Sequence, residues 1–292
     1  MTSLFPELPI EKWEPTKETL HRYLQILGKI KLELMPLPYQ NHWWHIKLYI
    51  NSRGFSTDSI PYGGFVFDIS IDCILHEVIV RSSTGFEKRF GLSDGLSVAE
   101  FYKKLFDILE KINLSVDILA EPYDLPDATP FSECYHHDSY DTSYVARFWN
   151  IMLQVDTIFK EFSGRSYSKT CPMHIYWHHM DLAVTRFSGE RGPDMPDASN
   201  ADKEAYSHEV ISFGFRAGDK NVRHPAFYSY TYPSPKHLNR GPLLPESAKW
   251  IDSNGSPVAF LNYDDIRHLD NPKEAILKFL ESSYQAGAKS AG

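Results

Sequence analysis

Three strand-like segments follow one another early in the chain with no room for a helix between them. Apolar and polar residues alternate over 65–72, and two further segments, 74–81 and 86–91, flank the turn Ser83-Thr84-Gly85. Parallel neighbours would need a crossover of about a dozen residues, so these strands are expected to pair as antiparallel ones. Further strands are expected at 46–50, 172–178, 181–187, 208–216 and 225–232.

Four main helices are expected around these strands, at 17–30, 98–112, 142–162 and 272–284. Ser97 and Glu100 have the spacing of a capping box, in which each side chain bonds the other residue's backbone N–H. Asp141 is a typical N-cap for the third helix, and Gly164 is well placed to end it. The sequence therefore predicts an α+β fold of mostly antiparallel sheets with four main helices.

The elements divide into two similar helix–strands–helix halves. We expect an N-terminal half at 1–120, a Pro-rich connector at 121–140 and a C-terminal half at 141–292, together forming one compact unit. An internal duplication would explain this order, but no residue-level repeat supports it. The segments 189–203 and 233–257 are expected to be irregular, and loops of this length are often lids or disordered segments.

Composition excludes several classes of protein. The chain has 30 Lys and Arg against 38 Asp and Glu, a formal charge of −8, whereas binding to a nucleic-acid backbone needs a basic face. No apolar stretch reaches the length of a membrane span. Cys73, Cys134 and Cys171 are odd in number and far apart, which favours reduced thiols. We therefore expect a cytoplasmic protein with neither a nucleic-acid nor a membrane partner.

Phosphate-loop, dinucleotide-binding, nucleophile-elbow and zinc-protease motifs do not occur in the sequence. The sequence therefore gives no motif support for P-loop nucleotide hydrolysis, a standard dinucleotide-binding fold, α/β-hydrolase chemistry or zinc-dependent proteolysis. The thirteen histidines instead fall into short clusters with aromatic residues.

The first cluster is Asn41-His42-Trp43-Trp44-His45. If it opens a strand, Trp43 and His45 share one face, and Trp44 faces the core with Ile46 and Leu48. His42 or His45 could then be a metal ligand or an acid–base group, with a Trp lining an apolar pocket. The alternative is that both Trp anchor the strand and the His donate to nearby carbonyls.

The second cluster is the run from Cys171 to Asp181. Strand alternation places His174, Tyr176 and His178 on one side, where they would line a pocket or face solvent. His179 and Asp181 match the H-x-D part of a 2-His-1-carboxylate iron site. We favour His174, because His179 shares the parity of the apolar face.

The third cluster is Glu204-Ala205-Tyr206-Ser207-His208-Glu209. Glu204 and His208 are four residues apart, so they share a face in a helix and in a strand. Ser212 and Gly214 are small and would leave room for a ligand, although Glu204 and His208, taken alone, slightly favour a surface ion pair. Arg186 could bind an acidic ligand, and His137 is a weaker candidate.

Three of these motifs together resemble a known family. Asn41-His42-Trp43-Trp44-His45, the stretch Asp181–Gly189 and the stretch Glu204–Glu209 are similar to those of a bacterial family of uncharacterised proteins, a domain of unknown function. The resemblance spans nearly the whole chain and implies one family unit. It implies no activity, and the family has small residues at the positions of His178 and His179.

Two functions are compatible with these clusters. The first is a metal-dependent enzyme, a hydrolase or an oxygenase, that acts on a small molecule with Zn or Fe. Its predicted metal ligands are His42, His45, His174, Glu204 and His208, of which His45, His174, Glu204 and His208 would also be catalytic. The second is a metal-free protein that binds or senses a small molecule through Trp43, Tyr176 and Arg186.

Overall fold

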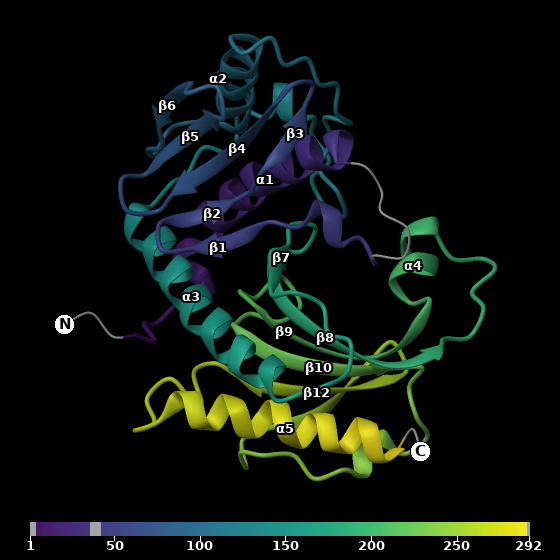
Figure 1. Ribbon diagram of the computed structural model, residues 1–292. Helices are drawn as coiled ribbons and strands as arrows, with labels where there is room; N and C mark the ends of the chain where they lie inside the picture. Colours follow the sequence, from purple (N-terminus) through teal and green to yellow (C-terminus); the bar gives the residue numbers. More distant parts are fainter. Residues whose placement is uncertain (1–3, 36–41, 291–292) are drawn as a thin grey trace.

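A computed structural model describes residues 4–35 and 42–290, and this part of the chain forms five α-helices and two antiparallel sheets (Figure 1). Four helices are long and one is short. They are α1 (Ile10–Leu34), α2 (Val98–Glu110), α3 (Thr142–Gly164), α4 (Asn200–Ala205) and α5 (Pro272–Ser290). The predicted α+β class with four main helices is confirmed. Asn41, the first residue of the predicted first cluster, lies outside the described residues.

The first sheet is built from residues 49–91. Its strands are β1 (Tyr49–Asn51), β2 (Gly54–Ser56), β3 (Ile60–Tyr62), β4 (Phe65–Asp72), β5 (Glu77–Ser82) and β6 (Glu87–Gly91). The order is β1-β2-β4-β5-β6, and β3 pairs with β4. All pairs are antiparallel. Gly85 has a φ of 86°, the left-handed conformation that the predicted turn between β5 and β6 requires.

The second sheet is built from residues 174–262. Its strands are β7 (His174–Tyr176), β8 (Asp181–Arg191), β9 (His208–Arg216), β10 (Ala226–Tyr232), β11 (Lys249–Ser253) and β12 (Ser256–Asn262), in the order β11-β12-β10-β9-β8-β7. The expectation of an irregular 233–257 was therefore wrong at its C-terminal end. Asn254 and Gly255 have φ values of 52° and 82°, and such a pair turns a tight hairpin between β11 and β12.

The helix ends follow the predicted caps. Ser97 accepts a hydrogen bond from the N–H of Glu100, and the Glu100 carboxylate accepts one from the N–H of Ser97, so the capping box is confirmed. Asp141 caps α3 by accepting from the N–H groups of Ser143 and Tyr144. The first helix begins earlier than predicted, at Ile10, and continues through Pro15.

The strand predicted at 46–50 begins only at Tyr49. His42 and Trp43 have φ values of 49° and 62°, and a 3-10 turn, η1, spans Trp44–Ile46. The two-face alternation expected for residues 43–48 was therefore wrong. His45 and Lys47 are as deeply buried as Ile46 and Leu48, because the segment is enclosed on both sides.

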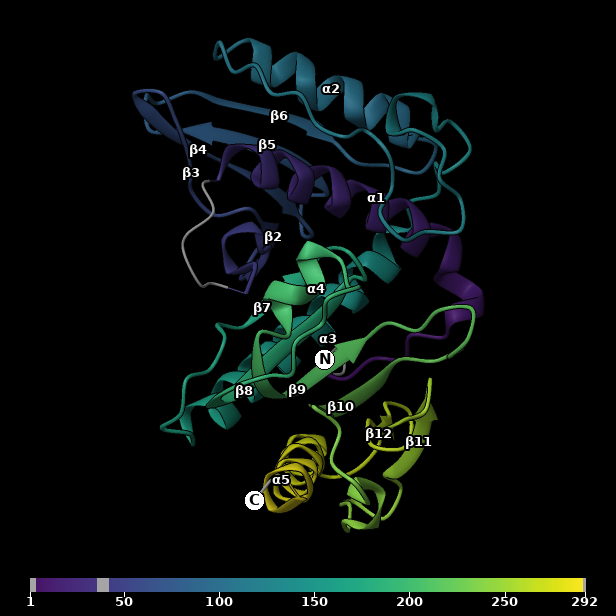
Figure 2. The ribbon, with the colours of Figure 1, turned by 90° about the vertical axis from the view of Figure 1, so that its right-hand side faces the viewer.

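The two sheets meet at their edge strands. Leu48, just before β1, and Ile175 in β7 exchange backbone hydrogen bonds of 3.3 and 2.9 Å. Helix α3 runs beside both sheets and contacts β1 and β8, and α5 packs on β9 and β10 (Figure 1). Figure 2 shows the same arrangement from the side, with α1 and α2 at the first sheet and α5 at the second. Residues 42–48 are thereby held where the sheets join.

None of the helices within 4–35 and 42–290 is long and apolar enough to cross a membrane. The division into halves at 1–120 and 141–292 stays an expectation, although each sheet is drawn from one of these halves.

Candidate functional site

Two lysines are buried at the junction of the sheets. Lys31 lies in the last turn of α1 and is 3% exposed, and Lys47 follows η1 and is 4% exposed. Burial lowers the pKa of each ammonium group to about 8. The Lys31 ammonium donates to the backbone carbonyls of Lys47 and Thr57. Neither lysine forms an ion pair within the described part of the chain.

Two histidines lie beside this lysine pair. His174 in β7 is 1% exposed, and burial, followed by the charge of Lys47, lowers its pKa to about 3. Its Nδ1–H donates to the carbonyl of Pro172, and its Nε2 has no hydrogen-bond partner among the described residues. The pKa of His45 is lowered by burial, then by Lys31 and Lys47. The charges of the same two ammonium groups therefore act on both rings.

A second group forms where β8 and β9 approach the 42–46 segment. The Nδ1–H of His42 donates to the backbone carbonyl of Glu204 at 3.2 Å, and Lys169 donates to the Nε2 of His42 at 3.2 Å. The ring centroid of His42 lies 5.5 Å from that of His208 and 4.6 Å from that of Phe187. Burial and then Lys169 lower the pKa of both histidines.

Trp44 joins the two groups into one site. The centroid of its ring lies 5.2 Å from the Lys47 ammonium and 5.1 Å from the Lys169 ammonium, and both distances are typical of cation–π contacts. We call this set the lysine–histidine site. It consists of Lys31, His42, Trp44, His45, Lys47, Lys169, His174 and His208.

A cavity of about 360 Å³ adjoins the site at the N-terminus of β9. Its walls include Arg191, Lys203, Tyr206 and Ser207. The Ser207 hydroxyl lies 3.1 Å from the Nδ1 of His208, so the wall of the cavity borders the site at that residue. Cationic side chains outnumber acidic ones in this wall, where Asp194 is the acidic residue.

Four of the five predicted metal ligands, the histidines, belong to the lysine–histidine site. Glu204 contributes a backbone carbonyl to it, which accepts hydrogen bonds from His42 and Ser207. Of the predicted ligand-binding residues, Trp43 lies against the ring of His45 at 5.7 Å, and Tyr176 against His174 at 4.2 Å between ring centroids.

Arg186 lies elsewhere, between β8, α3 and α5. Its guanidinium is 3.7 Å from the ring centroid of Phe162 and 4.4 Å from that of Tyr284. It also donates to the carbonyl of Phe162 at 2.6 Å. The guanidinium that was expected to bind an acidic ligand is thus packed against two aromatic rings of the protein.

The space predicted beside Gly214 is filled by a tyrosine. A Cβ on Gly214 would lie 2.2 Å from the ring of Tyr228, whose hydroxyl donates to the buried Asp181 carboxylate. His179, the other half of the H-x-D triplet, is exposed and pairs with Asp124 at 3.0 Å. The two side chains of the triplet thus have different partners.

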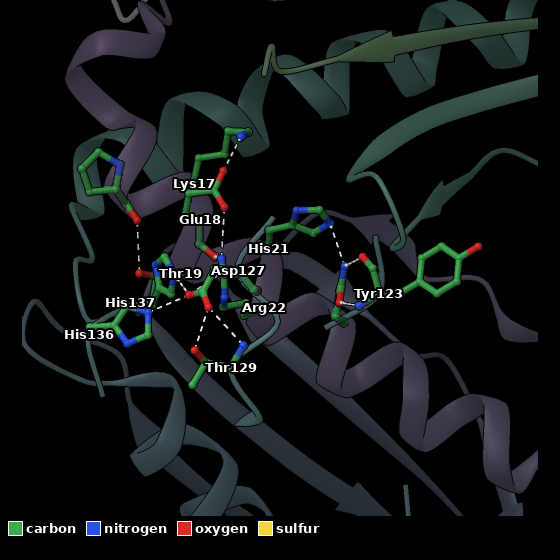
Figure 3. Close-up of polar contacts among 12 residues, drawn as sticks. Lys17, Glu18, Thr19, His21, Arg22, Tyr123, Asp127, Thr129, His136 and His137 are labelled. Atoms are coloured by element: carbon green, nitrogen blue, oxygen red, sulfur yellow. Dashed lines mark hydrogen bonds and ion pairs between the residues drawn. The ribbon is translucent and has the colours of Figure 1, made fainter. Parts of the chain in front are cut away.

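A further polar cluster lies where the 121–140 connector meets α1. The Oδ2 of Asp127 is 2.6 Å from the Nε2 of His136 and 2.9 Å from the Nε2 of His137. Arg22 of α1 lies between this carboxylate and Glu18 (Figure 3). The predicted sites omitted this cluster except for His137, although Cys134, His136 and His137 fall within four positions of the sequence.

These features define an α+β protein with a partly buried cationic and aromatic site between two antiparallel sheets. The chain belongs to the family described as Family of unknown function (DUF5996), whose model matches residues 5–292. The expected resemblance to a domain of unknown function is therefore confirmed over nearly the whole chain. Neither the curated proteins nor the solved structures include a match to this chain.

Proposed function

We propose that this protein binds an anionic small molecule at the lysine–histidine site. One observation carries the proposal. Lys47 is 4% exposed, forms neither an ion pair nor a hydrogen bond through its ammonium group with the described residues, and lies beside the similarly buried Lys31. Holding a largely buried ammonium group against an aromatic ring, with no anion beside it among the described residues, costs about 1–3 kcal/mol, and strongly perturbed groups gather at functional sites. A bound anion would offset this cost.

The charges at the site support one of the two functions that the sequence left open. A Zn or Fe ion on the predicted histidines would lie near the ammonium groups of Lys47 and Lys169, which repel a divalent cation. The described contacts of Glu204 place its carbonyl rather than its carboxylate at His42. The same lysines attract an anion, so the metal-free binding function is favoured.

His174 limits the chemistry of this ligand. Because the Nδ1 of His174 donates to Pro172, its Nε2 is a buried acceptor without a donor among the described residues. A phosphate group or a hydroxycarboxylate carries acceptor oxygens for Lys47 and a hydroxyl for this nitrogen. The adjoining cavity, with Arg191 and Lys203 in its wall, is large enough for the remainder of a small molecule.

Thermal unfolding in Tris chloride, with and without ligands, tests the proposal. Inorganic phosphate or malate at about a hundred times its dissociation constant should raise the Tm by about 5 °C. Sulfate and succinate, which lack the hydroxyl near neutral pH, should raise it less. Lys47→Met should abolish the shift.

Lys29→Met is the matched control, because Lys29 is a buried lysine of the same helix as Lys31 but has Glu33 and Glu121 nearby. This variant should keep the full response to phosphate. Equal responses of Lys47→Met and Lys29→Met, or a shift produced by Zn²⁺ and by none of the anions, would contradict the proposal.

A further inference from the structure

The connector cluster holds four potential ligands of a soft divalent metal. Within the described residues, the carboxylate of Asp127, the thiol of Cys134 and the rings of His136 and His137 offer ligand atoms that all lie within 4.8 Å of one another. Nitrogen, sulfur and one oxygen are the donor types of tetrahedral zinc sites. The predicted metal ligands at the sheet junction do not form such a group.

The spacing of these atoms suits a tetrahedral ion. With zinc–ligand bonds of about 2.0–2.3 Å, neighbouring ligand atoms in a tetrahedron lie about 3.3–3.8 Å apart. The two Asp127–histidine distances, 2.6 and 2.9 Å, are shorter than this, and every other distance in the cluster is below 4.8 Å. Shifts of about 1 Å or less would therefore bring all four atoms to an ion at their centre.

The surroundings already orient the carboxylate. Thr129 donates to the Oδ1 of Asp127 through its N–H at 3.0 Å and its hydroxyl at 2.7 Å, so Oδ2 is the oxygen turned toward the two rings (Figure 3). Hydrogen bonds of this kind to the second oxygen are typical around metal-bound carboxylates. The charge of Arg22, 3.6 Å from Oδ2, is shared with Glu18 at 3.0 Å.

We propose that Asp127, Cys134, His136 and His137 together bind one Zn²⁺ ion in a closed tetrahedral site. Binding replaces the Asp127–histidine hydrogen bonds. The thiol releases its proton to solvent, and each ring presents an unprotonated Nε2 and keeps its proton on Nδ1. No electron is transferred, and no water-filled coordination position remains, so the site is structural rather than catalytic.

The position of the ligands indicates what the ion stabilises. The carbonyls of Cys134 and His137 accept from the first N–H groups of α2, Ala99 and Val98, and the carbonyl of Asp127 accepts from Arg22 of α1 at 3.2 Å. An ion held here would fasten the connector to the N-terminus of α2 and to the side of α1. This site does not depend on the anion site at the sheet junction.

Titration of the untagged, chelator-treated protein with Co²⁺ tests the site. We expect one equivalent of Co²⁺ to produce the intense visible bands of tetrahedral cobalt and a thiolate-to-cobalt charge-transfer band in the near ultraviolet. Equimolar Zn²⁺ should abolish both. Cys134→Ser should remove the charge-transfer band, and His137→Gln should weaken Co²⁺ binding at least tenfold.

Two variants serve as matched controls. Cys73→Ser changes another buried thiol, and His179→Gln changes another histidine paired with an aspartate. Both should bind Co²⁺ as the unchanged protein does. Pale octahedral spectra, or a charge-transfer band that survives Cys134→Ser, would overturn the proposal. Since circular dichroism reports whether each variant is folded, loss of binding can be separated from loss of structure.

Discussion

Trp177 donates its indole N–H to the backbone carbonyl of Ile46 at 3.0 Å. Trp177 directly follows β7, and Ile46 directly precedes Lys47. The bond therefore connects the second sheet to the segment that carries Lys47. Both residues are nearly inaccessible to solvent. The indole also packs against α1. The geometry of the lysine–histidine site thus depends on how closely α1 approaches this ring.

A glycine makes that approach possible. A Cβ on Gly28 of α1 would lie 2.3 Å from the Trp177 ring, so Gly28→Ala should displace the indole and lower the free energy of unfolding by about 1–3 kcal/mol. Gly164→Ala, at an open position of α3, should instead stabilise by up to about 1 kcal/mol. Urea unfolding followed by tryptophan fluorescence measures both. Equal effects of the two substitutions would show that contact with Trp177 is unimportant.

The sequence predicted the regular elements well where local signals and burial agreed. The capping box at Ser97 and the N-cap at Asp141 act within a few residues, so they are readable from sequence and are present in the structure. The turn at His42 and Trp43 was missed because the fold, rather than local preference, holds both residues in the left-handed region. The hairpin at Asn254-Gly255 did have a readable signal.

Removing the Lys47 charge should stabilise the anion-free protein. Below pH 8 this lysine is charged in both the folded and the unfolded state, and its burial penalty is complete. Above its unfolded pKa of about 10.4 it is neutral in both, and the penalty vanishes. Lys47→Met should therefore gain about 1–3 kcal/mol at pH 7, and the gain should shrink as the pH rises from about 8 to about 10. Urea midpoints of both proteins at matched pH measure this difference, and a gain independent of pH would contradict it.

The Tyr228 hydroxyl should matter most when Asp181 is ionised. Burial raises the pKa of this carboxyl, and the hydrogen bond from Tyr228 lowers it. Tyr228→Phe should therefore cost about 1–3 kcal/mol at pH 7. The cost should diminish as the pH falls toward 4, because a protonated carboxyl no longer needs the donor. Thermal unfolding across this range tests the trend, and Tyr135→Phe at an exposed position is the control.

Arg186 should support the fold without contributing to ligand binding. Lysine cannot reproduce the planar contacts with Phe162 and Tyr284, so Arg186→Lys should lower the free energy of unfolding by about 1–3 kcal/mol. The phosphate-induced rise in Tm should persist in this variant. Loss of that response in a folded variant would show that Arg186 does contribute to ligand binding.

The candidate site was predictable in residue type but only partly in chemistry. Clustered histidines directed attention to His42, His174 and His208, and the structure places each of them within the lysine–histidine site. The lysines that give the site its charge lie at positions 31, 47 and 169, on separate elements. Only the fold brings Lys47 and Lys169 to the ring of Trp44 and Lys31 to the carbonyl of Lys47.

A crystal soaked with arsenate tests the central claim most directly, because arsenate has the shape and hydroxyl of phosphate and scatters X-rays anomalously. We predict an anomalous peak within hydrogen-bonding distance of the Lys47 ammonium, and its absence from crystals of the Lys47→Met variant. Anomalous density confined to surface arginines, with only water beside Lys47, would contradict the account.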